Sequence, residues 1–475
     1  MAIPLALWRP FQRTLASQSP FRISVLSGQR LKVGSNGPKS SIACRGEHTP
    51  PLQQGSHLLC RVGFPPQLVQ ARRSFSVLRR SSRLEEGPIM EKVCLNEAAR
   101  VVEVEWSEGG VSMFPYVWLR DNCQCQQCFN PDSRARLFLM ADLDVNLSPV
   151  TADVYAAGTM LTVDWPDGHH SQYDWSWLKG RCFSTQALEK RGRDWQRKTK
   201  LWGSELAHDL PKADFPTLLT DDRALYDFLF RLDSVGLVLV QNVPCEIGQL
   251  QRLANRVAFL RHTNYGKEFV VKSKPNPSNV AYTSAKLGLH TDLPQYNYAP
   301  GVQMLHCIEQ CKGEGGDNHL VDGFNVAYQL KEENPEAFRL LTTLKVNFQD
   351  EGIDFHRFYL RERRPIISLD DKGNVENINY NDQVRDSILD LPTDQVQALY
   401  GALKAYNTIM YRPKNCVRHK MAAGEMIAFN NTRTLHGRLA YSQTGGTRHL
   451  QGGYLDWDEI YSRMRVLKTD LGIQD

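Results

Sequence analysis

Two stretches decide the fold: Leu289-His290-Thr291-Asp292-Leu293-Pro294 and, far downstream, Phe429-Asn430-Asn431-Thr432-Arg433-Thr434-Leu435-His436-Gly437-Arg438. Side chains alternate along an extended strand, so His290 and Asp292 are expected on the same side of one strand. His436 lies 144 residues after Asp292, about the length that a barrel domain needs to bring its chain back to the same end. Two histidines and one carboxylate form a set that leaves positions open on Fe(II) for a co-substrate and oxygen.

An arginine follows the second histidine. Arg448 stands twelve residues after His436, within Thr447-Arg448-His449-Leu450. An arginine on the next strand can bind a distal carboxylate through two parallel hydrogen bonds, which a lysine cannot. This order of residues resembles the iron- and 2-oxoglutarate-dependent oxygenases of the taurine dioxygenase type.

Longer phrases narrow the resemblance to the γ-butyrobetaine/trimethyllysine dioxygenase family. The phrases are residues 117–123, 279–283, 289–294, 321–324 and 448–452, and the resemblance runs from about Met90 to the C-terminus. It implies that His290, Asp292 and His436 bind iron. It also implies that Arg448 pairs with 2-oxoglutarate, that oxygen is consumed, that ascorbate serves as reductant and that the chain forms a homodimer.

The reaction implied by the resemblance is hydroxylation of γ-butyrobetaine at C3 to give L-carnitine, with succinate and carbon dioxide. Two alternatives stay open at this point. One is trimethyllysine hydroxylation, which shares the cationic head of the substrate. The other is a non-enzymatic zinc-binding interaction protein with an inactive barrel.

The resemblance also implies the residues that bind a quaternary ammonium substrate. Such a group cannot donate a hydrogen bond and is attracted to the faces of aromatic rings. The matching aromatic residues are Tyr265, Phe269, Tyr282 and Tyr454. Phe269 stands where the family has tryptophan, and Leu293 stands where it has tyrosine. The substrate carboxylate is expected at Asn279 and Asn381, with Asn379 an equally suitable neighbour.

Three cysteines predict a zinc site. Cys123, Cys125 and Cys128 lie within six residues, which suits one tetrahedral site with a fourth ligand from elsewhere. The family pairs this cluster with a histidine in a W-P-D-x-H phrase, which favours His169. His170 and Cys182 remain alternatives. Four protein ligands close the site, so zinc there is expected to be structural.

Charge is distributed unevenly along the 475 residues, whose net charge is +5. Residues 1–84 contain 13 Lys and Arg and one acidic residue, which gives +12 and leaves the rest at −7. The acidic remainder argues against a nucleic-acid surface. No apolar run reaches the roughly 18 residues that a membrane span needs. The basic stretch is typical of a mitochondrial transit segment, and a cytoplasmic protein is the alternative if translation starts at Met90.

Periodicity predicts a mainly β chain with flanking helices. Residues 101–106 alternate as a strand, and residues 221–233 place Leu225, Phe228, Leu229 and Leu232 on one helical face. Thr393 is expected to cap a later helix. We therefore expect an N-terminal extension over residues 1–89, a small zinc-binding β-domain over residues 90–190, and a catalytic double-stranded β-helix, or jelly roll, over residues 205–475.

Overall fold

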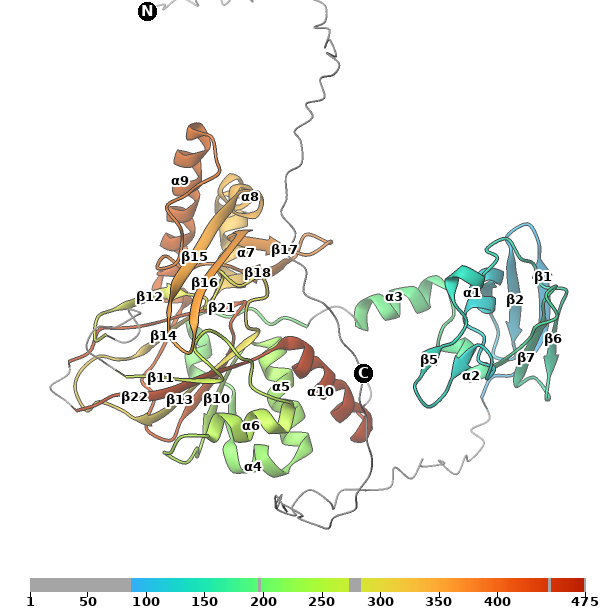
Figure 1. Ribbon diagram of the computed structural model, residues 1–475, viewed down its shortest axis with the longest axis horizontal. Coiled ribbons are helices and arrows are strands. Elements are labelled where there is room, and N and C mark those ends of the chain that lie inside the picture. The colour runs from blue at the N-terminus through green and yellow to red at the C-terminus, as the bar shows by residue number, and fades with distance from the viewer. Residues whose placement is uncertain (1–86, 195–197, 273–282, 443–445, 474–475) are drawn as a thin grey trace, which may run out of the picture. The chain divides into compact units, whose positions relative to one another are not determined.

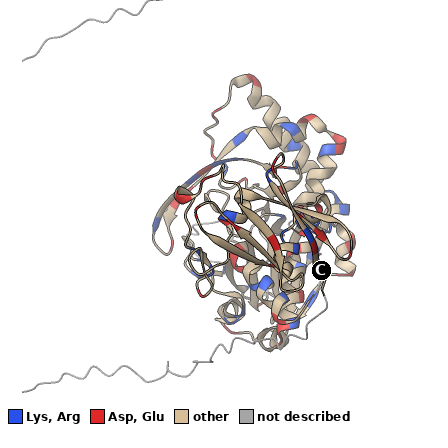
Figure 2. Ribbon diagram, turned by 90° about the vertical axis from the view of Figure 1, so that its right-hand side faces the viewer, with Lys and Arg blue, Asp and Glu red and all other residues tan. Residues whose placement is uncertain are grey.

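The structure, a computed structural model, describes residues 87–194, 198–272, 283–442 and 446–473. The predicted transit segment therefore lies outside the described residues. None of the described helices is both long and apolar enough to cross a membrane. Acidic and basic residues are interspersed along the helices and strands (Figure 2).

The N-terminal part consists of two three-stranded antiparallel sheets around one hydrophobic core. The first sheet contains β1 (Met90–Asn96), β2 (Val101–Trp106) and β3 (Val111–Pro115), and helix α1 (Tyr116–Asp121) follows it. The second contains β6 (Thr151–Tyr155), β7 (Met160–Asp164) and β8 (His170–Asp174), followed by α2 (Trp175–Lys179) and α3 (Thr185–Asp194). A short hairpin, β4 (Phe129–Asn130) and β5 (Ala135–Arg136), connects the two halves.

These two sheets are the halves of an internal repeat that the sequence analysis did not detect. Residues 102–123 align without gaps on residues 161–182, and the identical pairs include Trp106/Trp165, Gly109/Gly168, Ser112/Ser171, Trp118/Trp177 and Cys123/Cys182. The Trp106 ring N–H donates to Ser112 Oγ at 2.9 Å, and Trp165 makes the same bond to Ser171 at 2.8 Å. The conserved bond closes the hairpin in each half, so the repeat is structural as well as sequential.

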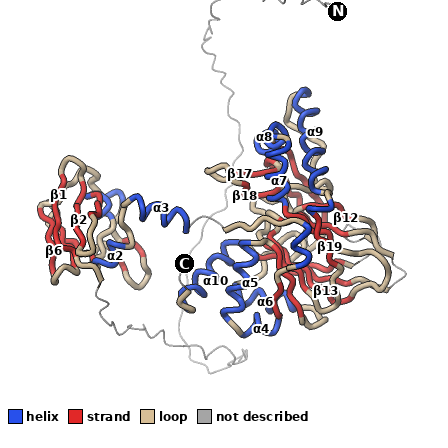
Figure 3. The backbone as a smooth tube through the Cα atoms, turned by 180° about the vertical axis from the view of Figure 1, so that it is seen from behind, coloured by secondary structure: helices blue, strands red, loops and turns tan. Residues whose placement is uncertain are grey.

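The C-terminal part contains two facing sheets, which confirms the predicted jelly roll with flanking helices (Figures 1 and 3). In spatial order, the large sheet is β11 (Glu268–Val271), β22 (His449–Leu455), β13 (Val302–Glu309), β20 (Met426–Asn430), β10 (Leu237–Gln241) and β9 (Lys212–Asp214). The small sheet is β12 (Leu287–His290), β21 (Thr434–Arg438), β14 (Asn318–Asp322) and β19 (Cys416–His419). Apolar side chains from both sheets form one buried cluster, and this packing joins the layers.

Helices cover the other faces of the two sheets. The large sheet packs against α4 (Phe215–Thr220), α5 (Asp222–Ser234), α6 (Gln249–Val257) and α10 (Trp457–Asp470). The small sheet packs against α7 (Gly323–Glu333), α8 (Pro335–Thr343) and α9 (Thr393–Met410). Two hairpins complete this part: β15 (Lys345–Ile353) with β16 (Arg357–Pro365), and β17 (Ile367–Leu369) with β18 (Val375–Ile378).

Local predictions had mixed outcomes. The predicted strand over residues 101–106 is β2, and the predicted helix over residues 221–233 is α5, with its four apolar residues buried. The prediction that Thr393 caps α9 is wrong. Thr393 is already the first helical residue, and Pro392 occupies the cap position without a side-chain hydrogen bond.

A buried ion pair fixes the turn between β20 and β21. Arg433 Nε and Nη2 donate to the two carboxylate oxygens of Asp322 at 3.0 and 2.7 Å. The same guanidinium donates to the carbonyl oxygens of Ser234 and Lys200 at 2.9 and 2.6 Å. Asp322 in turn caps α7 by accepting from Phe324 N. The pair therefore joins the turn to the end of α5, the start of α7 and the segment that precedes the jelly roll.

Arg433→Met should destabilise the protein by about 3–5 kcal/mol, because it leaves the Asp322 carboxylate buried without a counter-charge. Equilibrium urea unfolding measures the change. The matched control is Arg412→Met, since Arg412 makes a two-bond pair with Glu333 at the surface and its loss should cost at most about 1 kcal/mol. Equal losses for the two variants would contradict the role assigned to the buried pair.

Candidate active site

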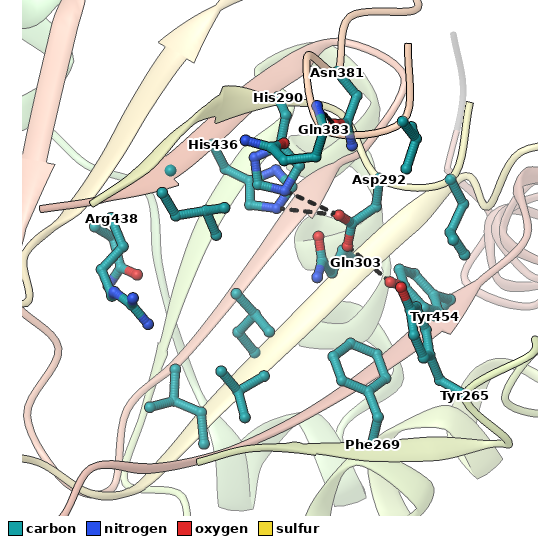
Figure 4. Close-up of a pocket in the computed structure, with 18 of the residues that line it drawn as sticks. Tyr265, Phe269, His290, Asp292, Gln303, Asn381, Gln383, His436, Arg438 and Tyr454 are labelled. Carbon is teal, nitrogen blue, oxygen red and sulfur yellow. Dashed lines mark hydrogen bonds and ion pairs between the residues drawn. The ribbon is translucent and has the colours of Figure 1, made fainter. Parts of the chain in front are cut away.

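His290 and His436 face each other across neighbouring strands. Strands β12 and β21 are antiparallel and place the two residues in register, with ring centroids 4.2 Å apart. One carboxylate oxygen of Asp292 lies 3.1 Å from His290 Nε2 and 3.7 Å from His436 Nε2 (Figure 4). The three ligand atoms lie within 4.8 Å of one another, so the structure brings the predicted triad together.

Asp292 lies beyond the strand on which the sequence placed it. Strand β12 ends at His290, so the alternation of strand side chains does not orient the carboxylate. Two other contacts hold it instead. The backbone N–H of Asp292 donates to Asn431 Oδ1 at 2.7 Å, and the Tyr454 hydroxyl donates to Asp292 Oδ2 at 2.7 Å.

Burial and mutual charge set the protonation of the triad. Burial opposes ionisation of Asp292, but the two histidines and the Tyr454 hydroxyl outweigh it and hold the pKa of Asp292 below its usual range. Burial also opposes protonation of His290, yet Asp292 outweighs it and raises the His290 pKa. Burial and the charge of His290 lower the pKa of His436 to about 3. His436 is therefore neutral and keeps an electron pair for a metal.

A hydrogen bond orients the His290 ring. His290 Nδ1 lies 2.8 Å from the carbonyl oxygen of Gly288, which requires that this nitrogen carry the proton. With Nδ1 bonded to the backbone, Nε2 is the ring nitrogen that faces Asp292 and that can ligate a metal, as in histidines whose other nitrogen bonds a carbonyl oxygen.

The pocket beside the triad lies between the two sheets. The large sheet contributes one wall, with Phe269, Val271, Gln303, Leu305, Leu450 and Tyr454. The small sheet contributes the facing wall, with Leu287, His290, Asn318, His436 and Arg438. The triad therefore opens into a cavity whose far end is apolar and aromatic (Figure 4).

Three of the four aromatic residues that were predicted to bind the ammonium group line this pocket next to one another. The ring centroids of Tyr265 and Phe269 lie 5.4 Å apart, as do those of Phe269 and Tyr454. Strand pairing sets Phe269 opposite Gly452, where an added Cβ would lie 2.3 Å from the phenyl ring. The absence of a side chain at residue 452 is therefore what allows the ring to lie against the strand.

The other predicted substrate residues have varied positions. Tyr282 and Asn279 lie outside the described residues. Asn381 lines the pocket, but its amide donates to Thr291 O at 3.3 Å and accepts from the Gln383 backbone N–H at 2.9 Å.

Asn379, the alternative to Asn381, and Leu293, which departs from the family, also differ in position. Asn379 is not among the residues that line the pocket, and its amide donates to Pro365 O and Ser368 Oγ. Leu293 does line the pocket, with a left-handed backbone at φ +58°.

Two buried arginines lie on the pocket wall. Burial lowers the pKa of Arg448, and no carboxylate of the described residues pairs with it. Arg438 Nη2 donates to the carbonyl oxygens of Thr283 and Ala285, both at 2.7 Å. Burial and the charge of Arg448 lower the Arg438 pKa to about 10. This side of the pocket is thus suited to an anion.

Comparison with known proteins assigns the family. The sequence pattern described as "Taurine catabolism dioxygenase TauD, TfdA family" matches residues 196–454, and that described as "Gamma-butyrobetaine hydroxylase-like, N-terminal" matches residues 93–179. The chain belongs to the TauD, TfdA dioxygenase family. It is therefore a 2-oxoglutarate-dependent dioxygenase that uses iron.

Three similar relatives extend this assignment. The chain is 41% identical to the Gamma-butyrobetaine dioxygenase of Homo sapiens over 78% of this chain and 95% of that protein. It is 36% identical to the Gamma-butyrobetaine dioxygenase of Pseudomonas sp. (strain AK-1), over 77% and 94%. It is 32% identical to "Trimethyllysine dioxygenase, mitochondrial" of Mus musculus, over 76% and 84%.

The donor atoms of this dioxygenase fit Fe(II). Two imidazole nitrogens and one carboxylate converge, which is the donor set of non-haem iron oxygenases. Both histidines are buried, and their rings lie in contact with centroids 4.2 Å apart.

A second group of potential metal ligands lies in the N-terminal part. His169 Nε2 lies 3.2, 3.6 and 3.5 Å from the sulfur atoms of Cys123, Cys125 and Cys128. A tetrahedral zinc ion with ordinary bond lengths sets sulfur and nitrogen ligands roughly 3.5 Å apart. Arg120 supports the group by donating to Cys128 Sγ at 3.5 Å and pairing with Asp167.

Both alternatives for the fourth position lie elsewhere. His170 is exposed and pairs with Asp164 at 2.7 Å. Cys182 is the repeat equivalent of Cys123, so it occupies the corresponding place in the other half of the repeat and bonds with Ser184.

The sequence analysis missed four residues of the site. Gln303, Gln383 and Arg438 line the pocket, and Asn431 bonds with the backbone of Asp292. Strand alternation from His436 could have found Arg438, two residues later. Gln303 could have been found as a polar residue within the apolar strand β13. Nothing local in the sequence distinguishes Gln383 or Asn431 from other loop residues.

Gly452→Ala should displace the Phe269 ring and lower kcat/KM for the oxidised substrate at least tenfold, because the added Cβ overlaps the ring. Turnover of 2-oxoglutarate without that substrate should change little. Gly453→Ala is the matched control, since its Cβ meets only a flexible end of Leu260 at 3.3 Å and other atoms at 3.4 Å. An unchanged kcat/KM in Gly452→Ala would show that the ring position is unimportant.

Proposed function

We propose that this dioxygenase hydroxylates γ-butyrobetaine at C3 to give L-carnitine, with succinate and carbon dioxide as the other products. The observation that carries the proposal is the pocket itself, which combines the triad, buried arginines and three adjacent aromatic rings. Relatives named Gamma-butyrobetaine dioxygenase support the choice of substrate.

In the proposed site, His290, Asp292 and His436 bind Fe(II). Iron with 2-oxoglutarate and oxygen supplies the oxidant for an unactivated C–H bond. Arg448 is assigned to the distal carboxylate of 2-oxoglutarate, because it is buried and no carboxylate of the described residues neutralises it. The contribution of the protein is to hold one carbon of the substrate near the metal and to exclude the others.

The aromatic end of the pocket is assigned to the trimethylammonium head. Tyr265, Phe269 and Tyr454 present ring faces, and the family resemblance adds Tyr282. The hydroxyl of Tyr454 is already bonded to Asp292, so this residue links the cation site to the iron site. Asn279 and Asn381 are assigned to the substrate carboxylate by the resemblance. The amide of Asn381 must exchange or share its present bonds to take that role.

The direct test supplies the full-length protein with Fe(II), 2-oxoglutarate and ascorbate, and compares γ-butyrobetaine with trimethyllysine by mass spectrometry of the products. We expect the gain of one oxygen atom mainly on γ-butyrobetaine. Faster hydroxylation of trimethyllysine would favour the related activity instead, which relatives named trimethyllysine dioxygenase also support.

Phe269→Trp should lower the KM for γ-butyrobetaine, because an indole attracts a cation more strongly than a phenyl ring does. The expected gain in binding free energy is about 0.5–2 kcal/mol. A neutral analogue with a tert-butyl head has the same shape and is the control. Equal responses of the charged and neutral compounds would mean that the aromatic residues contribute only apolar contact, and would contradict a cationic substrate.

We also propose that Cys123, Cys125, Cys128 and His169 bind a structural zinc ion in an N-terminal domain over residues 90–190, ahead of a catalytic domain over residues 205–475. Cys125→Ser should lower zinc content and thermal stability, while Cys182→Ser should keep the zinc because Cys182 lies apart from the cluster. Elemental analysis decides the matter. A wild-type protein without zinc, or equal loss in both variants, would reject the site.

Three further assignments rest on the family and the basic N-terminus. We propose a homodimer, ascorbate as the reductant and a mitochondrial location directed by residues 1–84. Mammalian relatives carrying the name "Trimethyllysine dioxygenase, mitochondrial" support the location. A reporter fused to residues 1–84 that stays in the cytosol would favour the cytoplasmic alternative with a start at Met90.

A further inference from the structure

Asn431 holds the backbone of Asp292 from both sides. Its Oδ1 accepts from the Asp292 N–H at 2.7 Å, and its Nδ2 donates to the Asp292 carbonyl oxygen at 2.9 Å. The same Nδ2 donates to Pro300 O at 3.0 Å. Only one orientation of the amide satisfies these three bonds, and the side chain is 1% exposed.

This clamp lies where the sheet no longer positions the chain. Strand β12 ends at His290, so the strand ladder does not fix the backbone of Asp292. The next residue, Leu293, adopts φ +58°, which a side chain other than glycine rarely adopts. The peptide group that joins Asp292 to Leu293 carries the carbonyl oxygen that Asn431 binds. A side-chain amide thus takes the place of a neighbouring strand.

The turn that carries Asn431 also leads to the second histidine. The backbone N–H of Asn431 donates to Gly301 O at 2.9 Å, and strand β21 begins three residues later and contains His436. One turn therefore sets the position of Asp292 through a side chain and that of His436 through the strand that follows.

We infer that Asn431 is a positioning residue that aims the Asp292 carboxylate at the metal site. The inference rests on the proposed role of Asp292 as an iron ligand. Asn431 does not touch the metal position itself. It acts through the Asp292 backbone, so its loss should weaken metal binding more than it weakens the fold.

The neighbouring Asn430 provides a matched control. It precedes Asn431 as the last residue of β20 and is also buried, and its Oδ1 accepts from the N–H and hydroxyl of Thr432 in the turn at 3.0 and 2.8 Å. None of these bonds reaches Asp292. Loss of the Asn430 side chain therefore weakens the turn without removing the clamp.

The experiment titrates Fe(II) anaerobically into full-length wild-type protein, Asn431→Ala, Asn430→Ala and Asp292→Ala, and records the melting temperature of each metal-free protein. We expect Asn431→Ala to bind Fe(II) 10–100-fold more weakly, as is usual when a residue that orients a metal ligand is lost. Asn430→Ala should stay within about twofold of wild type at a similar loss of melting temperature.

Wild-type affinity in Asn431→Ala, or an equal loss of affinity in Asn430→Ala, would overturn the inference while leaving the iron site in place. Wild-type affinity in Asp292→Ala would instead remove Asp292 from the iron site and overturn the proposed triad together with the inference. If Asn431→Ala does not fold, Asn431→Ser is measured in its place, because serine keeps one donor and one acceptor.

Discussion

The ion pair between Arg433 and Asp322 is the constraint on which the jelly roll depends. It is almost fully buried, so each partner needs the other, and the guanidinium also satisfies carbonyl groups of two other segments. Through it the β20–β21 turn is fixed against α5 and α7. That turn contains Asn431, and strand β21 after it contains His436. The triad proposed to bind iron is thus held in place from a salt bridge that does not belong to it.

The two sheets contribute different kinds of side chain to the pocket. The small sheet presents the two histidines and Arg438, which are polar or charged groups. The large sheet presents Phe269, Tyr454 and aliphatic side chains, which are suited to the body of an organic cation. Tyr454 connects the two functions, because its ring belongs to the aromatic wall and its hydroxyl bonds with Asp292.

The sequence revealed the chemistry more fully than the geometry. The spacing of His290, Asp292, His436 and Arg448 was enough to find the pocket, because the residue types and their order can be read directly from the sequence. The orientation of Asp292 was not predictable by strand alternation, since the strand ends two residues earlier and a distant amide completes the placement. No periodicity encodes a contact between residues so far apart in the sequence.

The N-terminal part shows the same limit. Three close cysteines predicted a metal site, yet the choice among His169, His170 and Cys182 needed the fold. The internal repeat explains why Cys182 is excluded, and the pattern was present in the sequence as paired tryptophans, glycines and serines. The predicted cap at Thr393 was wrong because α9 already begins at that residue. Pro392 occupies the N-cap position and makes no side-chain hydrogen bond there.

The central claim is that one iron ion is bound by His290, Asp292 and His436 at the edge of the small sheet. Anomalous diffraction at the iron absorption edge, from crystals grown anaerobically with Fe(II) and 2-oxoglutarate, tests it most directly. The account predicts one iron peak within bonding distance of His290 Nε2, His436 Nε2 and a carboxylate oxygen of Asp292. An iron peak bound by other residues, or none beside this triad, would contradict it.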